Sequence, residues 1–223
     1  MFQLRRKNDP SHRAIFCIAA FLFLTAAGTA VFMIRHYCLY GGWAIDNTLL
    51  NYSISIRTPW LDDFFRMITA TGETLPVILA TLGIIVLLLK RGKWGSAAFT
   101  GFYMIGVWLL NELLKRLLQR PRPPFELHLA HATGYSLPSG HSMNFMALVL
   151  LGLYMLWCFS KEKSLYRSAA LFFIPFALLV GISRIYLHVH YFSDVITGWS
   201  VGIAWAAFFI MLHLRIATKK SVL

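Results

Sequence analysis

The chain has 223 residues, of which 58% are hydrophobic and only 13% are charged, well below the roughly 25% charged residues of a soluble domain. Its formal net charge is +12 at pH 7, but the basic residues are dispersed along the chain and form no single patch of the kind that binds nucleic acid. The composition therefore predicts an integral membrane protein.

Six apolar stretches are long enough to cross the hydrocarbon core of a bilayer as helices, which takes about 20 residues each. In chain order they are residues 14–34, 67–89, 95–113, 142–160, 168–187 and 195–214. Residues 35–64 are too polar to cross, and their aromatic side chains favour short interfacial helices. We see no internal repeat and no soluble domain. The predicted fold is all-α: a single domain over residues 1–223, built as a bundle of six transmembrane helices with interfacial helices on the outer side.

The distribution of basic residues indicates the orientation of this bundle. More of the 21 Lys and Arg residues lie on the side of the two termini than on the other side, so the positive-inside rule places both termini in the cytoplasm. The first apolar stretch follows basic residues, as in a signal peptide, but it is too long for one and is expected to remain as an anchor.

The string "KRLLQRPRP" at 115–123 follows the third stretch, on the side where basic residues are normally sparse. Pro121 and Pro123 end the helix and force a turn. This turn can bring Lys115 and Arg122 together around one anion, for which a guanidinium supplies a planar fork. The alternative interpretation is a solvated helix end with snorkelling side chains.

The string "PSGH" at 138–141 directly precedes the fourth stretch. Ser139 is a good N-cap, and the first turn of a helix leaves backbone N–H groups free to bind an anion. Gly140 allows that anion to approach the backbone closely, and His141 lies beside it. Ordinary capping would explain the serine, but neither the glycine nor the histidine.

The string "SRIYLHVHYFSD" at 183–194 lies between the fifth and sixth stretches. His190 and Asp194 are four residues apart, so the carboxylate can bind one imidazole nitrogen and leave the other as a nucleophile. Arg184 lies six residues before His190, about 120° away on an ideal helix, so we expect the fifth helix to end between them. His188 is interpreted as a structural residue.

Together these three strings resemble the type 2 phosphatidic acid phosphatase family, whose motifs they match at every defining position. The matching residues are Lys115, Arg122 and Pro123, then Pro138, Ser139, Gly140 and His141, then Ser183, Arg184, His190 and Asp194. With the six-span layout, the resemblance covers nearly the whole chain.

The resemblance implies that His190 is a nucleophile that forms a phosphohistidine, that Asp194 orients it, and that His141 protonates the leaving oxygen and then activates water. It also implies a set of residues that hold the phosphoryl oxygens: Lys115, Arg122, Ser139, Gly140 and Arg184. No metal or other cofactor is expected, because three cations and helix-end amides can stabilise the charge that Mg²⁺ stabilises in other phosphoryl-transfer enzymes.

The implied partners are a lipid phosphate substrate and the bilayer itself, with no nucleic acid and no obligate protein partner. The implied location is a bacterial cytoplasmic membrane, with the site facing outward. We expect phosphatidylglycerophosphate as the substrate, with undecaprenyl pyrophosphate or a broad set of lipid phosphates as the alternative. Glu73, Ser183 and His128 are candidate headgroup or site-lining residues, and Glu126 and His131 lie in the same outer loop as His128.

Two other functions are compatible with parts of the sequence. A transporter would also have six spans with intramembrane polar groups, but its polar groups would lie near the midplane, whereas these gather at one face. A metal hydrolase could use His188, His190 and Asp194 as ligands, but the neighbouring cations would repel a divalent metal.

Overall fold

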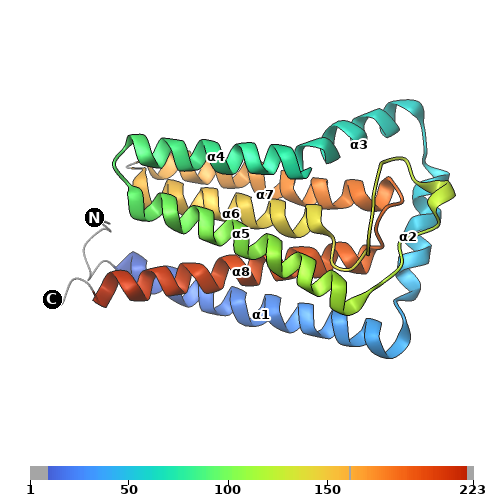
Figure 1. Cartoon of the computed structure of the whole chain (residues 1–223), viewed down its shortest axis with the longest axis horizontal. Helices are drawn as coiled ribbons and strands as arrows, with labels where there is room; N and C mark the ends of the chain where they lie inside the picture. Colours follow the sequence, from blue (N-terminus) through green and yellow to red (C-terminus); the bar gives the residue numbers. More distant parts are fainter. Residues whose placement is uncertain (1–9, 161, 220–223) are drawn as a thin grey trace.

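The computed structural model describes residues 10–160 and 162–219, and these form a bundle of long helices (Figure 1). In chain order the helices are α1 (Pro10–Tyr40), α2 (Ala44–Ser55), α3 (Pro59–Thr71), α4 (Thr74–Lys90), α5 (Trp94–Leu118), the short 3₁₀ helix η1 (Phe125–Leu127), α6 (Gly140–Phe159), α7 (Lys163–Tyr186) and α8 (Phe192–Lys219). No strand occurs in these two ranges, and the predicted all-α fold is confirmed.

The helices have the length and composition of membrane spans. Five of those described, namely α1, α5, α6, α7 and α8, are long and apolar enough to cross a bilayer, and α3 with α4 makes a sixth span if the pair is counted as one. Large apolar side chains such as Phe21, Phe102 and Leu171 are exposed on the outside of the bundle, where lipid would cover them. The chain is a multi-pass membrane protein.

The second span differs from the prediction, because it is bent by 43° between α3 and α4. Thr58 caps α3 and Pro59 occupies its first turn, both of which favour a helix start at this point. Pro76 disfavours a continuous helix at this point, because its ring would clash with the carbonyl group of Gly72. The bend lies beside the candidate site described below.

The bundle has two distinct ends. The start of α1 and the end of α8 lie at one end, whereas α2 crosses the opposite end (Figure 1). The loop between α5 and α6 and the turn between α7 and α8 lie at the same end as α2. We call this the loop end. α2 corresponds to the interfacial helix predicted within residues 35–64.

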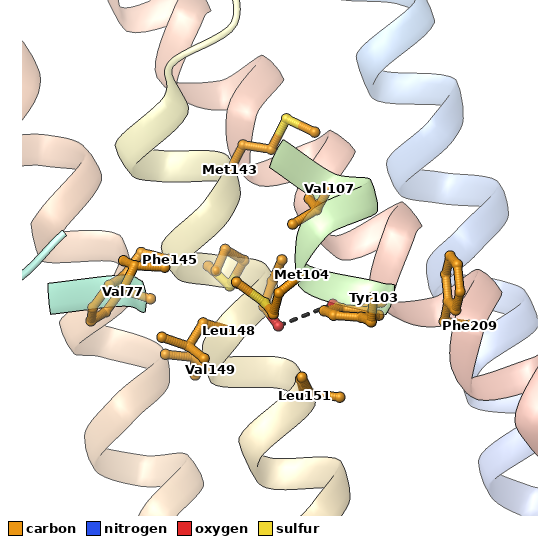
Figure 2. Close-up of a cluster of buried hydrophobic side chains, with 14 of the residues drawn as sticks. Val77, Tyr103, Met104, Val107, Met143, Phe145, Leu148, Val149, Leu151 and Phe209 are labelled. Atoms are coloured by element: carbon orange, nitrogen blue, oxygen red, sulfur yellow. Dashed lines mark hydrogen bonds between the residues drawn. The ribbon is translucent and has the colours of Figure 1, made fainter. Parts of the chain in front are cut away.

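The core is centred on α6. Within a membrane-length window, 56% of α6 is buried, compared with 17% of α1, so α6 forms the interior and α1 the periphery. Apolar side chains from α4, α5 and α8 pack around it (Figure 2). The hydroxyl group of Tyr103 on α5 donates a 3.0 Å hydrogen bond to the carbonyl oxygen of Ala147, which ties α5 to α6 at this depth.

Two glycines on α8 set its close approach to α6. A Cβ atom on Gly198 would lie 2.7 Å from the carbonyl oxygen of Ser139, and one on Gly202 would lie 2.7 Å from that of Met143. Small residues four apart are a known means of bringing membrane helices together. The backbone N–H of Ser139 then donates to the carbonyl oxygen of Asp194 at 3.1 Å, so the start of α6 is held beside the start of α8.

Candidate active site

A cavity of about 630 Å³ lies at the loop end of the bundle, and its lining is divided by polarity. One part carries cations, histidines and a helix start: Lys115, Arg122, Gly140, His141, Arg184 and His190. The other part is apolar and is formed by side chains of α4 and α5, including Val77, Ile78, Leu82, Ile105 and Trp108. The structure therefore brings six residues from all three predicted strings to one cavity.

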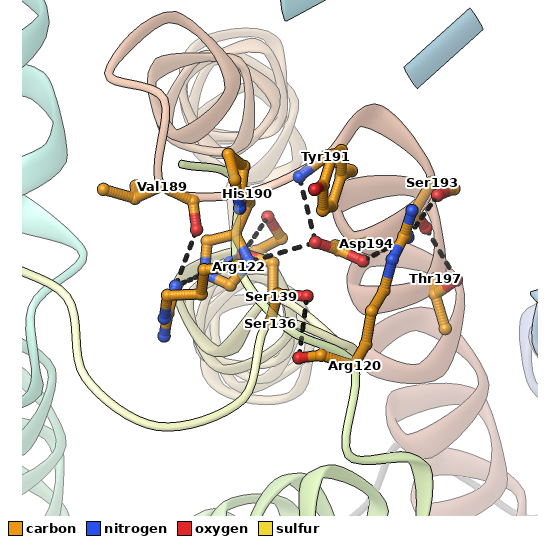
Figure 3. A network of polar contacts seen from close by, with 12 residues as sticks. Arg120, Arg122, Ser136, Ser139, Val189, His190, Tyr191, Ser193, Asp194 and Thr197 are labelled. Carbon is orange, nitrogen blue, oxygen red and sulfur yellow. Dashed lines mark hydrogen bonds and ion pairs between the residues drawn. The ribbon is translucent and has the colours of Figure 1, made fainter. Parts of the chain in front are cut away.

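His190 is held between a carboxylate and a guanidinium (Figure 3). Its Nδ1 lies 3.5 Å from Oδ2 of Asp194, at the outer limit of a hydrogen bond, and its Nε2 lies 3.1 Å from Nη1 of Arg122. A guanidinium only donates hydrogen bonds, so Nε2 is the acceptor and the ring proton resides on Nδ1, facing Asp194. The lone pair of His190 is therefore on Nε2, the nitrogen next to Arg122, and both residues line the cavity.

The protonation state of His190 follows from its surroundings. Burial lowers the pKa of His190 well below its usual value, and the charges of Arg122, Arg184 and Lys115 lower this pKa further. The imidazole is therefore neutral near pH 7, which is the state that a nitrogen nucleophile requires.

The three cations of the cavity have no carboxylate partner within salt-bridge distance in the described ranges. Arg122 is positioned by backbone carbonyl groups, to which it donates at 2.7–3.0 Å: those of Thr133, Gly134 and Val189. Arg184, only 3% exposed, donates to the hydroxyl group of Thr69 at 2.5 Å. Converging cations that form no salt bridge are suited to bind an anion, because buried positive charge is stable only when paired.

The start of α6 supplies the remaining polar groups. The side chain of Ser139 is fully buried and accepts hydrogen bonds from the backbone N–H and the hydroxyl group of Ser142, at 3.4 and 2.9 Å. It caps the helix and does not line the cavity, whereas Gly140 and His141 do. The Nε2 atom of His141 is buried without a hydrogen-bond partner among the described residues.

A buried ion network that was not predicted from the sequence lies next to Asp194. Arg120 donates from Nη1 to Oδ1 of Asp194 at 2.6 Å and from Nη2 to Oδ2 of Asp46 at 2.8 Å (Figure 3 shows the first contact). Asp46 also accepts from the backbone N–H and hydroxyl group of Ser193, at 2.8 and 2.7 Å. This network fixes the Asp194 carboxylate and attaches α2 to the site. The available signals were Asp46 in the interfacial segment and Arg120 in the basic string.

His188 takes part in a separate cluster of polar contacts. Its Nδ1 lies 2.9 Å from Nη2 of Arg57 and 3.4 Å from the hydroxyl group of Ser53. The ligand set considered for a metal hydrolase is therefore not assembled. Within residues 10–160 and 162–219, no group of three His, Cys, Asp or Glu side chains is arranged to hold a metal ion.

The peripheral candidates are only partly placed at the cavity. Ser183 is fully buried and donates to the carbonyl oxygen of Val180 at 2.6 Å, and His128 lies 3.0 Å from the carbonyl oxygen of Pro123. Neither of these two side chains lines the cavity. Glu73 is exposed at the start of α4, next to the lining residues Gly72 and Thr74. Of the two histidines in the outer loop, His128 and His131, it is His131 that lines the cavity.

The chain is similar to proteins of a known family. Residues 96–217, more than half of the chain, match the family model of the PAP2 superfamily. The chain belongs to this superfamily, and its fold and site define a membrane lipid phosphatase.

Two curated relatives and two solved structures illustrate the range of this class. Phosphatidylglycerophosphatase B of Bacillus subtilis is 33% identical over 167 residues, covering 71% of this chain and 78% of the relative. Dolichyldiphosphatase of Saccharomyces cerevisiae is 29% identical over 150 residues, covering 63% and 60%. The crystal structure of the B. subtilis transmembrane PAP2-type phosphatidylglycerolphosphate phosphatase superposes with a TM-score of 0.69 at 26% identity, covering 91% of this chain and 96% of that one. Aquifex aeolicus LpxE, at 22% identity and a TM-score of 0.59, covers 75% and 95% and shares the fold.

The position of the His141 ring can be tested through Gly72. A Cβ atom on Gly72 would lie 2.6 Å from Cγ1 of Val180 and 3.2 Å from Cδ2 of His141. We expect Gly72→Ala to displace this ring and to lower kcat for phosphate release by about tenfold or more, since small misplacements of catalytic groups are costly. Gly83→Ala is the matched control, because a Cβ there meets nothing within 4 Å. Equal kcat values for the two variants would contradict the role given to Gly72.

Proposed function

We propose that the protein hydrolyses the terminal phosphate of phosphatidylglycerophosphate to give phosphatidylglycerol, through a phosphohistidine formed on His190. The observation that carries this proposal is the cavity itself, in which three cations and two histidines at one part adjoin an apolar part. The printed activities of the B. subtilis relative and structure support the choice of substrate.

The two parts of the cavity suit the two parts of a lipid phosphate. Its apolar part is formed by α4 and α5, whose outer faces carry exposed leucine, isoleucine and tryptophan side chains. A lipid can therefore reach the cavity from the bilayer and keep its acyl chains among these helices. Its terminal phosphate then lies among Lys115, Arg122 and Arg184, where fixed positive charge replaces water.

In the first step, Nε2 of His190 attacks the phosphorus atom in line with the ester oxygen. The N–P bond forms while the P–O bond breaks, and His141, protonated once the phosphate dianion is bound beside it, donates its proton to the leaving glycerol oxygen. The proton on Nδ1 of His190 stays in place, and Asp194 stabilises the positive charge that develops on the ring. The cations and the backbone N–H groups at the start of α6 bind the phosphoryl oxygens.

In the second step, a water molecule attacks the phosphohistidine. His141, now neutral, accepts a proton from this water, the N–P bond breaks, and inorganic phosphate leaves with His190 restored. These two steps require no metal ion, because the charge on the transferred phosphoryl group is balanced by side chains of the protein itself.

A polyprenyl pyrophosphate is the second candidate substrate, because dolichyldiphosphatases are among the relatives. Either substrate fits a site that faces outward from a bacterial cytoplasmic membrane. This orientation is favoured by the basic residues around the end of the bundle opposite the site, which the positive-inside rule assigns to the cytoplasm.

The proposal predicts which lipids the purified protein hydrolyses in detergent. We expect phosphate release in excess EDTA, with a higher kcat/KM for phosphatidylglycerophosphate than for phosphatidic acid or undecaprenyl pyrophosphate. Arg91→Ala, a change at an exposed residue beyond the end of α4, serves as the control and should behave as the unmodified protein. No release from any lipid phosphate would favour a transporter. Loss of activity in EDTA with recovery on adding a divalent metal would favour a metal hydrolase.

A further inference from the structure

Several polar residues line the cavity without a role in the steps above, and three of them lie on α5 and α6: Asn111, Glu112 and Asn144. We call them the linker subsite. Asn111 lies four residues before Lys115 on α5, which ends at the site, and Asn144 lies three residues after His141 on α6, which begins there. Both amides are thus displaced about one helical turn, roughly 5 Å, into the bundle from the phosphate-binding groups.

The side chains of the linker subsite are poorly satisfied within the described chain. Oδ1 of Asn144 is buried and has no hydrogen-bond partner there. Asn111 is 1% exposed, and the hydrogen bond recorded for its side chain is a donation to the sulfur atom of Met143 at 3.3 Å, a weak acceptor. Glu112 is half-buried and forms no salt bridge in residues 10–160 and 162–219. Because buried polar groups are normally hydrogen-bonded, these residues are suited to a polar group of a ligand.

The depth of the linker subsite identifies the part of the substrate that reaches it. With the terminal phosphate among the cations and the acyl chains in the apolar part, the group that joins them passes these three side chains. In phosphatidylglycerophosphate the group bonded to the terminal phosphate is a glycerol with a free hydroxyl group, and a phosphodiester follows only beyond it, whereas in a polyprenyl pyrophosphate the second phosphate is bonded directly to the terminal one.

We propose that the linker subsite binds the hydroxyl group of the alcohol next to the scissile phosphate and so selects a hydroxylated linker over a pyrophosphate. This inference rests on the proposed function. A hydroxyl group both donates and accepts, so it satisfies an asparagine amide in either orientation. The carboxylate of Glu112 accepts a donated proton and repels a second phosphate at the same depth.

The test combines removal of the amide from the enzyme with removal of the hydroxyl group from the substrate. The substrates are phosphatidylglycerophosphate and its analogue with a propane-1,3-diol linker, and the enzymes are the unmodified full-length protein and Asn144→Leu. We expect the unmodified protein to prefer the hydroxylated substrate by about 10- to 100-fold in kcat/KM, because loss of a buried hydrogen-bond partner is costly. Asn144→Leu should lose this preference while hydrolysing the analogue as the unmodified protein does. Asn51→Leu, the same change at an exposed position on α2, is the control and should retain the preference.

Glu112→Gln tests the charge contribution separately. It should raise kcat/KM for undecaprenyl pyrophosphate relative to phosphatidylglycerophosphate by about tenfold, because it removes one like charge from the path of the second phosphate. An unchanged ratio would overturn this part of the proposal.

The outcomes separate this inference from the proposed function. If the unmodified protein hydrolyses both linker analogues equally well, the proposed function stands and the linker subsite is wrong; this comparison needs no variant to fold. Equal losses on both substrates in Asn144→Leu would show a merely structural role and would also overturn the inference. If the unmodified protein releases phosphate from neither substrate, both proposals fail together.

Discussion

Replacement of His190 by alanine is expected to abolish phosphate release, with a loss in kcat on the order of 10⁴- to 10⁶-fold, as for the removal of other enzymatic nucleophiles. The reason is geometric. The neutral ring presents Nε2 to the cavity and is held from behind by Asp194, and no other imidazole of the described chain has this combination. The measurement is single-turnover phosphate release from phosphatidylglycerophosphate.

Two further variants serve as controls for this result. His190→Asn keeps a polar side chain in the buried position and should be equally inactive, whereas Arg91→Ala should be fully active. Thermal unfolding of each variant in detergent would show whether the protein is still folded. Activity of His190→Ala within about tenfold of the unmodified protein would remove His190 from the nucleophile role.

Replacement of Arg120 by methionine is expected to have the largest effect on stability. Arg120 is 4% exposed and bridges Asp46 and Asp194, so its loss leaves two carboxylates buried without their cation. Breaking a buried ion pair in this way lowers the free energy of unfolding by about 3–5 kcal/mol. Because Asp194 is then no longer held in position, kcat should fall by about 100-fold or more. Thermal unfolding and kcat should be measured on the same preparation.

Arg116→Met is the matched control, because Arg116 belongs to the same basic string but is exposed. It should leave both stability and kcat unchanged. Arg120→Lys separates charge from geometry, since one ammonium cannot reproduce the two-armed contact, and it should recover only part of the stability. If Arg120→Met unfolded at the temperature of the unmodified protein and kept its kcat, the network would have no positioning role.

Local sequence features were sufficient to predict the membrane spans and the point at which the helix ends within residues 183–194. Each apolar stretch is helical, although the second is divided between α3 and α4, because a backbone in lipid must satisfy its own hydrogen bonds. The angular argument that a helix must end between Arg184 and His190 is confirmed, since α7 ends at Tyr186. Ser139 caps α6 as its position before the apolar run predicted.

Features that depend on contacts distant in sequence could not be predicted. Arg120 meets Asp46 across 74 residues, and Arg184 meets Thr69 across 115, and neither pair has a periodic signature. The bend of the second span combines a glycine with a proline four residues later, a signal that was present but was not used. The same holds for Gly198 and Gly202, whose spacing indicates a close helix contact but does not identify the partner helix.

The most direct test of the whole account is to trap the covalent intermediate. Phosphatidylglycerophosphate labelled with ³²P in its terminal phosphate would be mixed with the purified protein and quenched with alkali within a single turnover. The account predicts alkali-stable, acid-labile label on the peptide that contains His190, and no such label in His190→Ala. Phosphate release that proceeds with no labelled protein at any time, or label that persists in His190→Ala, would contradict it.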